Sequence, residues 1–125
     1  MIRYLIDADT AIYALSGRYE VMRARFAELQ PGEIGISVIS FAEIALGSNN
    51  GKPPPPELLE SFLNVIELLP FEESAAREYA RLPFKRARFD RLLAAHALSI
   101  GAIVITNNEA DFADVPGLKV ENWTV

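Results

Sequence analysis

The chain has 125 residues, half of them hydrophobic, and a formal net charge of −5. This length predicts a single domain over residues 1–125 with a sizeable core. The acidic balance argues against a broad basic surface for nucleic acid, though not against a local one. The lack of cysteine excludes disulfides and thiolate metal sites. No apolar run could span a bilayer, and an acid at position 7 does not suit a signal peptide, so we expect a cytoplasmic protein.

The first residues predict the element on which the site depends. Residues 2–6 are rich in β-branched and aromatic side chains, which favours a short buried strand. The run stops at Asp7, and residues 11–15 continue as a short helix. An acid delivered to the carboxyl end of a buried strand, just before a helix, is the usual site geometry of an open α/β sheet.

Short apolar runs then alternate with amphipathic segments along the chain. This alternation predicts an α/β fold with a parallel sheet covered on both faces. The further strands are expected at residues 34–38, 65–69, 103–105 and 118–120. The further helices are expected at residues 19–29, 40–45 (stopped near Gly47), 57–64, 72–81 and 90–100.

Four carboxylates stand at informative places. Asp7 follows the first strand and Asp111 lies in the loop after the fourth, so a parallel sheet brings both to one edge. Asp90 begins a helix, and Glu43 is the one charge in the apolar run 34–46.

Each acid also has a plainer interpretation when it is taken singly. Asp90 could cap its helix, and Ser40 with Glu43 matches a capping box. Asp111 could form a turn. Asp7 is harder to explain in this way, because a carboxylate at the mouth of a buried strand needs a partner.

Taken together, the acids predict a metal site. Carboxylates that converge on one edge repel one another unless a cation lies among them, and such hard oxygen ligands suit Mg²⁺ or Mn²⁺. A zinc site is disfavoured because the chain has no cysteine and His96 as its one histidine. His96 lies nearly two helical turns beyond Asp90, so we assign it a structural or partner-facing role. Acids around Mg²⁺ equip a protein for phosphoryl chemistry.

At this point several motifs, in matching order and spacing, resemble the PIN domain. Within it they look most like the VapC toxins of bacterial and archaeal toxin–antitoxin pairs. The resemblance covers essentially the whole chain. It is carried by Ile6-Asp7-Ala8-Asp9-Thr10, Ile36-Ser37-Val38-Ile39 with Ala42-Glu43, Asp90-Arg91-Leu92-Leu93-Ala94-Ala95-His96, Ile105-Thr106-Asn107-Asn108 with Asp111-Phe112, and Val115-Pro116-Gly117-Leu118.

The resemblance implies a three-layer α/β/α fold with about five parallel strands, and a Mg²⁺- or Mn²⁺-dependent endoribonuclease. It assigns metal binding and catalysis to Asp7, Glu43, Asp90 and Asp111. Thr106 and Asn108 would support the loop of the fourth acid. The chain departs from the family where members commonly show Asp-Thr-Asn and this sequence has Asp7-Ala8-Asp9. Asp9 would then add a supporting carboxylate or a cap. The segment 79–90 is also shorter than in many relatives, which affects the substrate groove.

The resemblance also implies partners. Such toxins form homodimers and bind a VapB-like antitoxin. We expect an apolar groove beside the helices at 19–29 and 57–64, including Phe26, Leu58 and Phe62. It should open toward the acids, where an antitoxin arginine would offset the carboxylate charge. The RNA substrate needs a local basic rim, for which the candidates are Lys85, Arg86, Arg88 and Arg91.

Two rival functions remain open. Asp7-x-Asp9-Thr10 also resembles the opening motif of haloacid-dehalogenase phosphatases, in which Asp7 would be the nucleophile. That function would leave Glu43 and Asp90 without a role, and lysines are scarce. Alternatively, the domain could be a non-catalytic PIN-like binding module that keeps its acids for structure. Loss of divalent metal binding in Asp7→Asn would separate the enzyme from that module.

Overall fold

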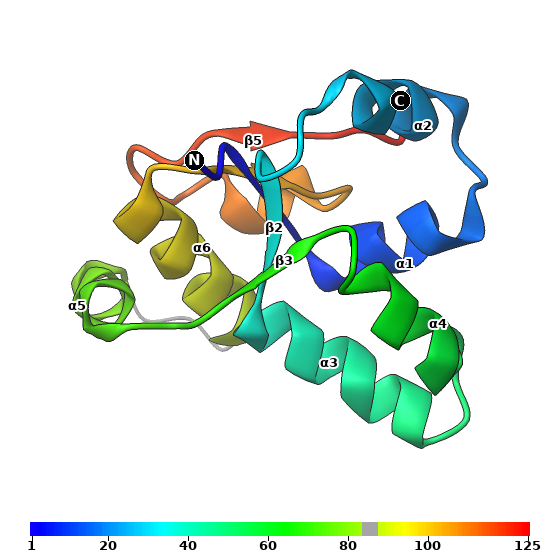
Figure 1. Cartoon of the computed structure of the whole chain (residues 1–125). Helices are drawn as coiled ribbons and strands as arrows, with labels where there is room; N and C mark the ends of the chain where they lie inside the picture. The colour runs from blue at the N-terminus through cyan, green and yellow to red at the C-terminus, as the bar shows by residue number, and fades with distance from the viewer. Residues whose placement is uncertain (84–87) are drawn as a thin grey trace.

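The computed structural model describes residues 1–83 and 88–125. In this part of the chain five parallel strands form one sheet in the order β3-β2-β1-β4-β5 (Figure 1). The first strand of the chain therefore lies in the middle of the sheet, with β2 on one side and β4 on the other. The strands are β1 Tyr4–Ile6, β2 Ile34–Ser37, β3 Glu67–Leu69, β4 Ile103–Ile105 and β5 Val120–Glu121.

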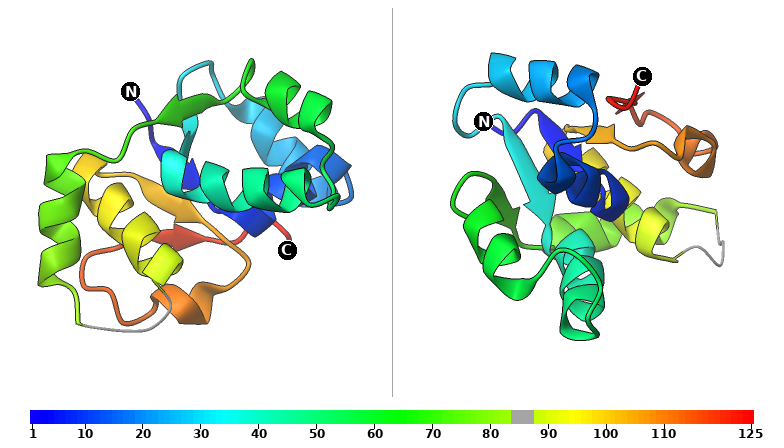
Figure 2. Two further views of the ribbon diagram at one scale, coloured as in Figure 1. Left: turned by 90° about the horizontal axis from the view of Figure 1, so that it is seen from below. Right: turned by 90° about the vertical axis from the view of Figure 1, so that its right-hand side faces the viewer.

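Helices cover both faces of this sheet. Figures 1 and 2 show α5 and α6 on one side of the strands, and α1 and α2 on the other, with α3 and α4 beyond the sheet. Among the described residues, no helix combines the length and the apolar character needed to cross a membrane. The helices are α1 Ala8–Ser16, α2 Glu20–Glu28, α3 Val38–Asn49, α4 Pro56–Phe62, α5 Glu73–Arg81, α6 Arg88–Ile100 and the 3₁₀ turn η1 Glu109–Phe112.

The central strand contributes side chains to two apolar cores, because successive side chains of a strand point to opposite faces of the sheet. Tyr4 and Ile6 belong to the core under α1 to α4, and Leu5 belongs to the core under α6. Both cores are built from side chains that are almost completely buried. The predicted three-layer fold with five parallel strands is confirmed. The strand ends differ by a few residues, since β1 begins at Tyr4 and β5 at Val120.

Helix α3 differs most from its predicted bounds, at both ends. It begins at Val38, because Ser37 Oγ accepts a hydrogen bond from the Ile39 N–H at 3.1 Å and caps the helix. The predicted capping box between Ser40 and Glu43 is therefore wrong, and Glu43 is free for another role. The helix also runs past Gly47 to Asn49, where the Asn50 N–H donates back to helix carbonyls.

Candidate acidic site at the sheet edge

Asp7 lies at the switch point of the sheet, where β2 and β3 extend to one side of β1 and β4 and β5 extend to the other. Its N–H donates to the Ile105 carbonyl at 3.0 Å, which fixes the backbone beyond the last pair of strand residues. Its Oδ1 accepts a hydrogen bond from the Thr10 N–H at 2.9 Å and so caps α1. In open α/β sheets this crevice, outside the carboxyl ends of the strands, is where ligands bind.

Burial dominates the electrostatics of Asp7. The residue is only 7% exposed, and this loss of hydration raises the pKa of its carboxyl. Hydrogen bonds from Thr10 and Thr106 oppose that shift, and the charge of Asp9 adds to it. Residues 7–10 were expected to supply helix caps, and the structure shows that Asp7 is the cap and Thr10 its donor, three residues later as is usual. Asp9 itself is exposed.

Two further acids interact with Asp7 from different helices. Glu43 comes from α3 and Asp90 from the first turn of α6. Although Glu43 is exposed as a residue, partial loss of water around its carboxyl raises its pKa to about 7, with further contributions from the charges of Asp90, Asp9 and Asp7. Partial burial likewise raises the pKa of Asp90 to about 6, and the charges of Asp111, Asp7 and Asp9 make smaller contributions in the same direction.

Asp111 is the fourth acid, and it interacts with Asp90. It lies on the exposed turn η1 after β4 and shares a hydrogen bond with Asp90 that favours the protonated form of Asp90. The loop before it is ordered by Thr106, whose Oγ1 accepts from the Asn108 N–H at 3.0 Å. Asn108 in turn accepts at its carbonyl from the Asp111 N–H at 3.0 Å.

The plain interpretation of Asp90 as a helix cap is wrong. Helix α6 begins at Arg88, so Asp90 lies inside the first turn, where its carboxyl is directed at other acids. Asp7 does cap a helix through the Thr10 N–H, and Thr106 also donates a hydrogen bond to its carboxyl.

The donor set fits a hard divalent cation, since it consists of carboxylate oxygens alone. Among the described residues, however, no three histidine, cysteine, aspartate or glutamate side chains are grouped tightly enough to hold a metal ion. Burial and the like charges of neighbouring carboxylates raise the pKa values of Glu43 and Asp90, and a bound cation would oppose this effect.

His96 has a structural position. It is 2% exposed, and its Nδ1 lies 2.7 Å from Ser37 Oγ in a buried hydrogen bond. Its ring also meets the edge of Phe71. Burial lowers its pKa. His96 therefore ties α6 to the residue that caps α3, which confirms the structural alternative for this side chain.

Of the four residues predicted for the basic rim, the structure describes the side chain of Arg91 alone. Lys85 and Arg86 lie outside the described residues, and Arg88 is described only as the first residue of α6. Arg91 is buried at 2% exposure and ion-paired with Asp114, so it does not present a cation to a nucleic acid. This burial was not predictable from the sequence, because Arg91 follows a run of basic residues that is typical of a solvated surface.

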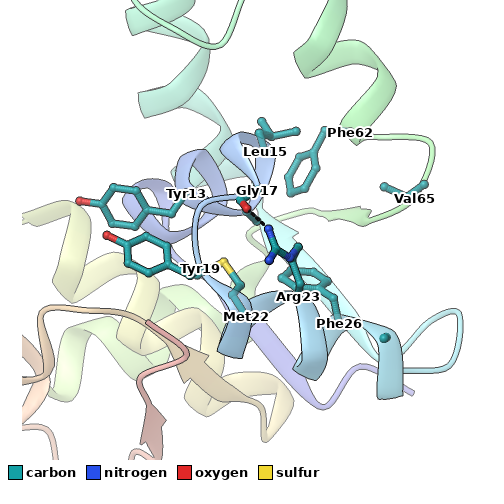
Figure 3. Close-up of a pocket in the computed structure, with 11 residues that line it drawn as sticks. Tyr13, Leu15, Gly17, Tyr19, Met22, Arg23, Phe26, Phe62 and Val65 are labelled. Atoms are coloured by element: carbon teal, nitrogen blue, oxygen red, sulfur yellow. Dashed lines mark hydrogen bonds between the residues drawn. The ribbon is translucent and has the colours of Figure 1, made fainter. Parts of the chain in front are cut away.

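An apolar groove of about 550 Å³ is lined by residues of α1, α2 and α4 and by none of the four acids, so its opening toward the acids stays a prediction. Figure 3 shows side chains from α1, α2 and α4 directed into it. Phe26 and Phe62 line it as predicted, whereas Leu58 is an exposed residue that does not. The contribution of α1 was missed, although Tyr13 and Leu15 follow the cap closely in the sequence. The lining consists of Tyr13, Ala14, Leu15, Gly17, Tyr19, Met22, Arg23, Phe26, Ala27, Phe62 and Val65.

Comparisons with known proteins agree with this geometry. A family model described as the PIN domain matches residues 4–118. The chain is 30% identical over 132 residues to the tRNA(fMet)-specific endonuclease VapC of Salmonella typhimurium, which covers 98% of this chain and 99% of that protein.

Two solved structures are similar over almost their whole length. One is the DNA-bound VapBC of Salmonella typhimurium, with a TM-score of 0.83 and 28% identity over 98% of this chain and 99% of that one. The other is VapBC2 of Rickettsia felis bound to a fragment of promoter DNA, with a TM-score of 0.84 and 27% identity over the same shares.

Proposed function

Because the chain belongs to the PIN domain family, and within it to the VapC toxins, we propose that it is a metal-dependent endoribonuclease acting as the toxin of a toxin–antitoxin pair. The observation that carries the metal-dependent chemistry is the mutual interaction of Asp7, Glu43 and Asp90. Each comes from a different element; the charges of Asp7 and Asp90 raise the pKa of Glu43, and the charge of Asp7 raises the pKa of Asp90. Such an arrangement destabilises the folded protein unless a cation is bound, which is expected of a functional site.

The four acids Asp7, Glu43, Asp90 and Asp111 would hold Mg²⁺ or Mn²⁺. When bound, the ion would neutralise charge that develops on the scissile phosphodiester and would activate a water molecule. Asp9 would add a further negative charge at the rim, because it acts electrostatically on three of the acids.

The chain's other residues would orient these acids. Thr10 and Thr106 donate to Asp7 and fix the direction of its carboxyl. Thr106 also holds Asn108, and through it the turn that carries Asp111. His96 would hold α6, with Asp90, against the start of α3, with Glu43.

The two rival functions fare differently. The family assignment overturns the haloacid-dehalogenase alternative, which required a different fold and left Glu43 and Asp90 without a role. A non-catalytic module is disfavoured because all four acids of the family pattern are present and interact.

The test is cleavage of RNA by purified protein with Mn²⁺ or Mg²⁺, compared with Asp7→Asn. Since the relative from Salmonella is specific for tRNA(fMet), a tRNA pool that contains initiator tRNA is the first substrate to use. We expect cleavage that EDTA abolishes and that Asp7→Asn lacks. Glu109→Gln, a neutralised exposed acid on η1, is the matched control and should cut normally. Metal-dependent cleavage by folded Asp7→Asn would contradict the proposal.

The groove supports an antitoxin partner. It is mostly apolar, and helix α1 connects it to the acids, because Asp7 caps the start of α1 while Tyr13 and Leu15 near its end line the groove. An antitoxin segment lying in the groove could therefore place an arginine beside Asp7 and Asp90 and compete with the metal. We also propose a homodimer, and we place the protein in the cytoplasm with its RNA substrates.

Val65→Glu tests the groove separately from the chemistry. Val65 lines the groove yet is 78% exposed, so a charge there should weaken antitoxin binding without disturbing the core. Leu46→Glu is a matched control, since Leu46 is 66% exposed on α3 and does not line the groove. The measurement is co-purification with the antitoxin from its own operon. Normal co-purification of Val65→Glu would place the antitoxin elsewhere and leave the nuclease proposal untouched.

A further inference from the structure

Arg91 is a buried cation that directly follows Asp90 in α6. Its side chain is 2% exposed, and its Nη1 donates to Asp114 Oδ1 at 2.9 Å. Its Nη2 donates to the Pro83 carbonyl at 3.1 Å. A guanidinium removed from water in this way is retained only when it has partners of this kind. The two contacts join three parts of the chain: the start of α6, the residues after η1, and the end of the segment that precedes the undescribed residues.

The turn η1 is attached to α6 at two points. Phe112, the last residue of η1, is 2% exposed and lies in the same core as Leu93 and Ala94 of α6. Two residues further on, Asp114 makes the ion pair with Arg91. Figure 2 shows the orange turn η1 beside the yellow helix α6. An apolar contact at one point allows the turn to roll around it, and the ion pair at a second point removes that freedom.

The two ends of this ion pair stand close in sequence to two acids of the site. Asp90 precedes Arg91, and Asp111 precedes Asp114 by three residues. These acids share a hydrogen bond, although their charges oppose their approach. Fixing the turn against α6 therefore has a direct consequence for the distance between the two carboxylates.

We propose that Arg91 is a positioning residue, which holds Asp111 beside Asp90 through Asp114 so that both can serve one metal ion. This inference rests on the proposed metal-dependent function. Arg91 acts through geometry, because Asp114 neutralises its charge, and the charges that act on Asp90 are those of Asp111, Asp7 and Asp9.

The experiment is a double-mutant cycle on Mn²⁺ affinity, measured by calorimetry on the purified chain. Loss of a group that orients a ligand typically weakens metal affinity by 10–100-fold, so we expect about a tenfold loss in Arg91→Met. Asp111→Asn should weaken Mn²⁺ affinity by a similar factor. If Arg91 acts through Asp111, the double variant should bind no more weakly than Asp111→Asn alone.

Two further variants make the cycle decisive. Arg77→Met removes an exposed arginine that pairs with Glu73 on α5, and it should bind Mn²⁺ as the parent does. If Arg91→Met does not fold, Asp114→Ala replaces it, because it removes the acceptor of Arg91 at a partly exposed position. Parental Mn²⁺ affinity in a folded Arg91→Met or Asp114→Ala, or losses that add fully in the double variant, would overturn the inference.

The outcome also separates this inference from the proposed function. If the parent chain and Asp7→Asn bind Mn²⁺ equally, the metal site itself is refuted. If Asp7→Asn loses binding while the Arg91 and Asp114 variants keep it, only the role of Arg91 is refuted.

Discussion

The raised pKa values of Glu43 and Asp90 connect the acidic site to the stability of the protein. In the folded state these pKa values are about 7 and about 6, compared with 4.5 and 3.8 for the free side chains. Between the two sets of values the folded chain binds more protons than the unfolded chain. The contribution of these two groups to the free energy of unfolding therefore falls as the pH rises through this window.

Glu43→Gln should remove part of that dependence. We expect the metal-free parent to lose thermal stability relative to Glu43→Gln as the pH rises from about 4.5 to about 7, because the glutamine cannot ionise. Above this window the variant should melt a few degrees higher than the parent. The measurement is a series of unfolding midpoints in EDTA for the two proteins. A constant difference across the range would contradict the raised pKa of Glu43.

At the same scale, Asp90→Asn should abolish RNA cleavage while leaving the fold intact. The amide keeps the shape of the side chain, and it removes a negative charge that the charges of Asp7 and Asp111 repel. We expect no metal-dependent cleavage and an unchanged or higher unfolding midpoint without metal. Glu73→Gln, on the exposed face of α5, is the control for loss of one acid. Full Mg²⁺-dependent activity in Asp90→Asn would refute our assignment of this acid.

At the scale of elements, His96 joins two helices that carry acids of the site. His96→Ala would remove the buried hydrogen bond to Ser37 and leave a cavity beside Phe71. We expect a loss of about 3 kcal/mol in the free energy of unfolding. Urea unfolding at neutral pH measures it, and an unchanged midpoint would show that this contact contributes little.

Two glycines should respond oppositely to alanine. A Cβ on Gly35 of β2 would lie 2.8 Å from Leu69 Cδ1 and 3.1 Å from the Glu67 carbonyl oxygen, so β3 would have to shift. We expect Gly35→Ala to cost about 1–3 kcal/mol. Gly47 lies inside α3 with only ordinary contacts to Lys52, so Gly47→Ala should stabilise the protein by about 0.5–1 kcal/mol. Urea midpoints of the pair test both expectations.

The elements also show how far sequence reasoning reaches. The place of Asp7 at the end of a buried strand was predictable because the apolar run before it ends so sharply, and Glu43 stood out because it interrupts an apolar stretch. The bounds of α3 were not predictable, because Ser37 and Ser40 are both suitable N-cap residues. The backbone conformation shows that Ser37 is the cap. The burial of Arg91 was not predictable, because its ion-pair partner Asp114 lies 23 residues away in sequence.

At the scale of the whole molecule, an acidic protein must bind an acidic polymer. With a net charge of −5, RNA binding would depend on a local group of cations, for which Lys85, Arg86 and Arg88 remain candidates. Replacing these three with alanine should lower the slope of log affinity against log salt by about 2, at about 0.7 per contact with single-stranded RNA. Alanine at Lys52, Arg77 and Lys119 is the control for three lost cations. The measurement is RNA binding in the Asp7→Asn background, in which we expect no cleavage; an unchanged slope would exclude the candidates.

The place of β1 in the middle of the sheet has a consequence for a chain that is still being made. Its partner β2 is available once residue 37 has been synthesised, but its other partner, β4, begins only at residue 103. The acids follow the same schedule, since Asp7 and Glu43 leave the ribosome long before Asp90 and Asp111. At about 5–20 residues per second, this interval lasts several seconds. If all four acids are needed to hold the metal, as proposed, a nascent chain could not cut RNA before Asp111 has joined the other three.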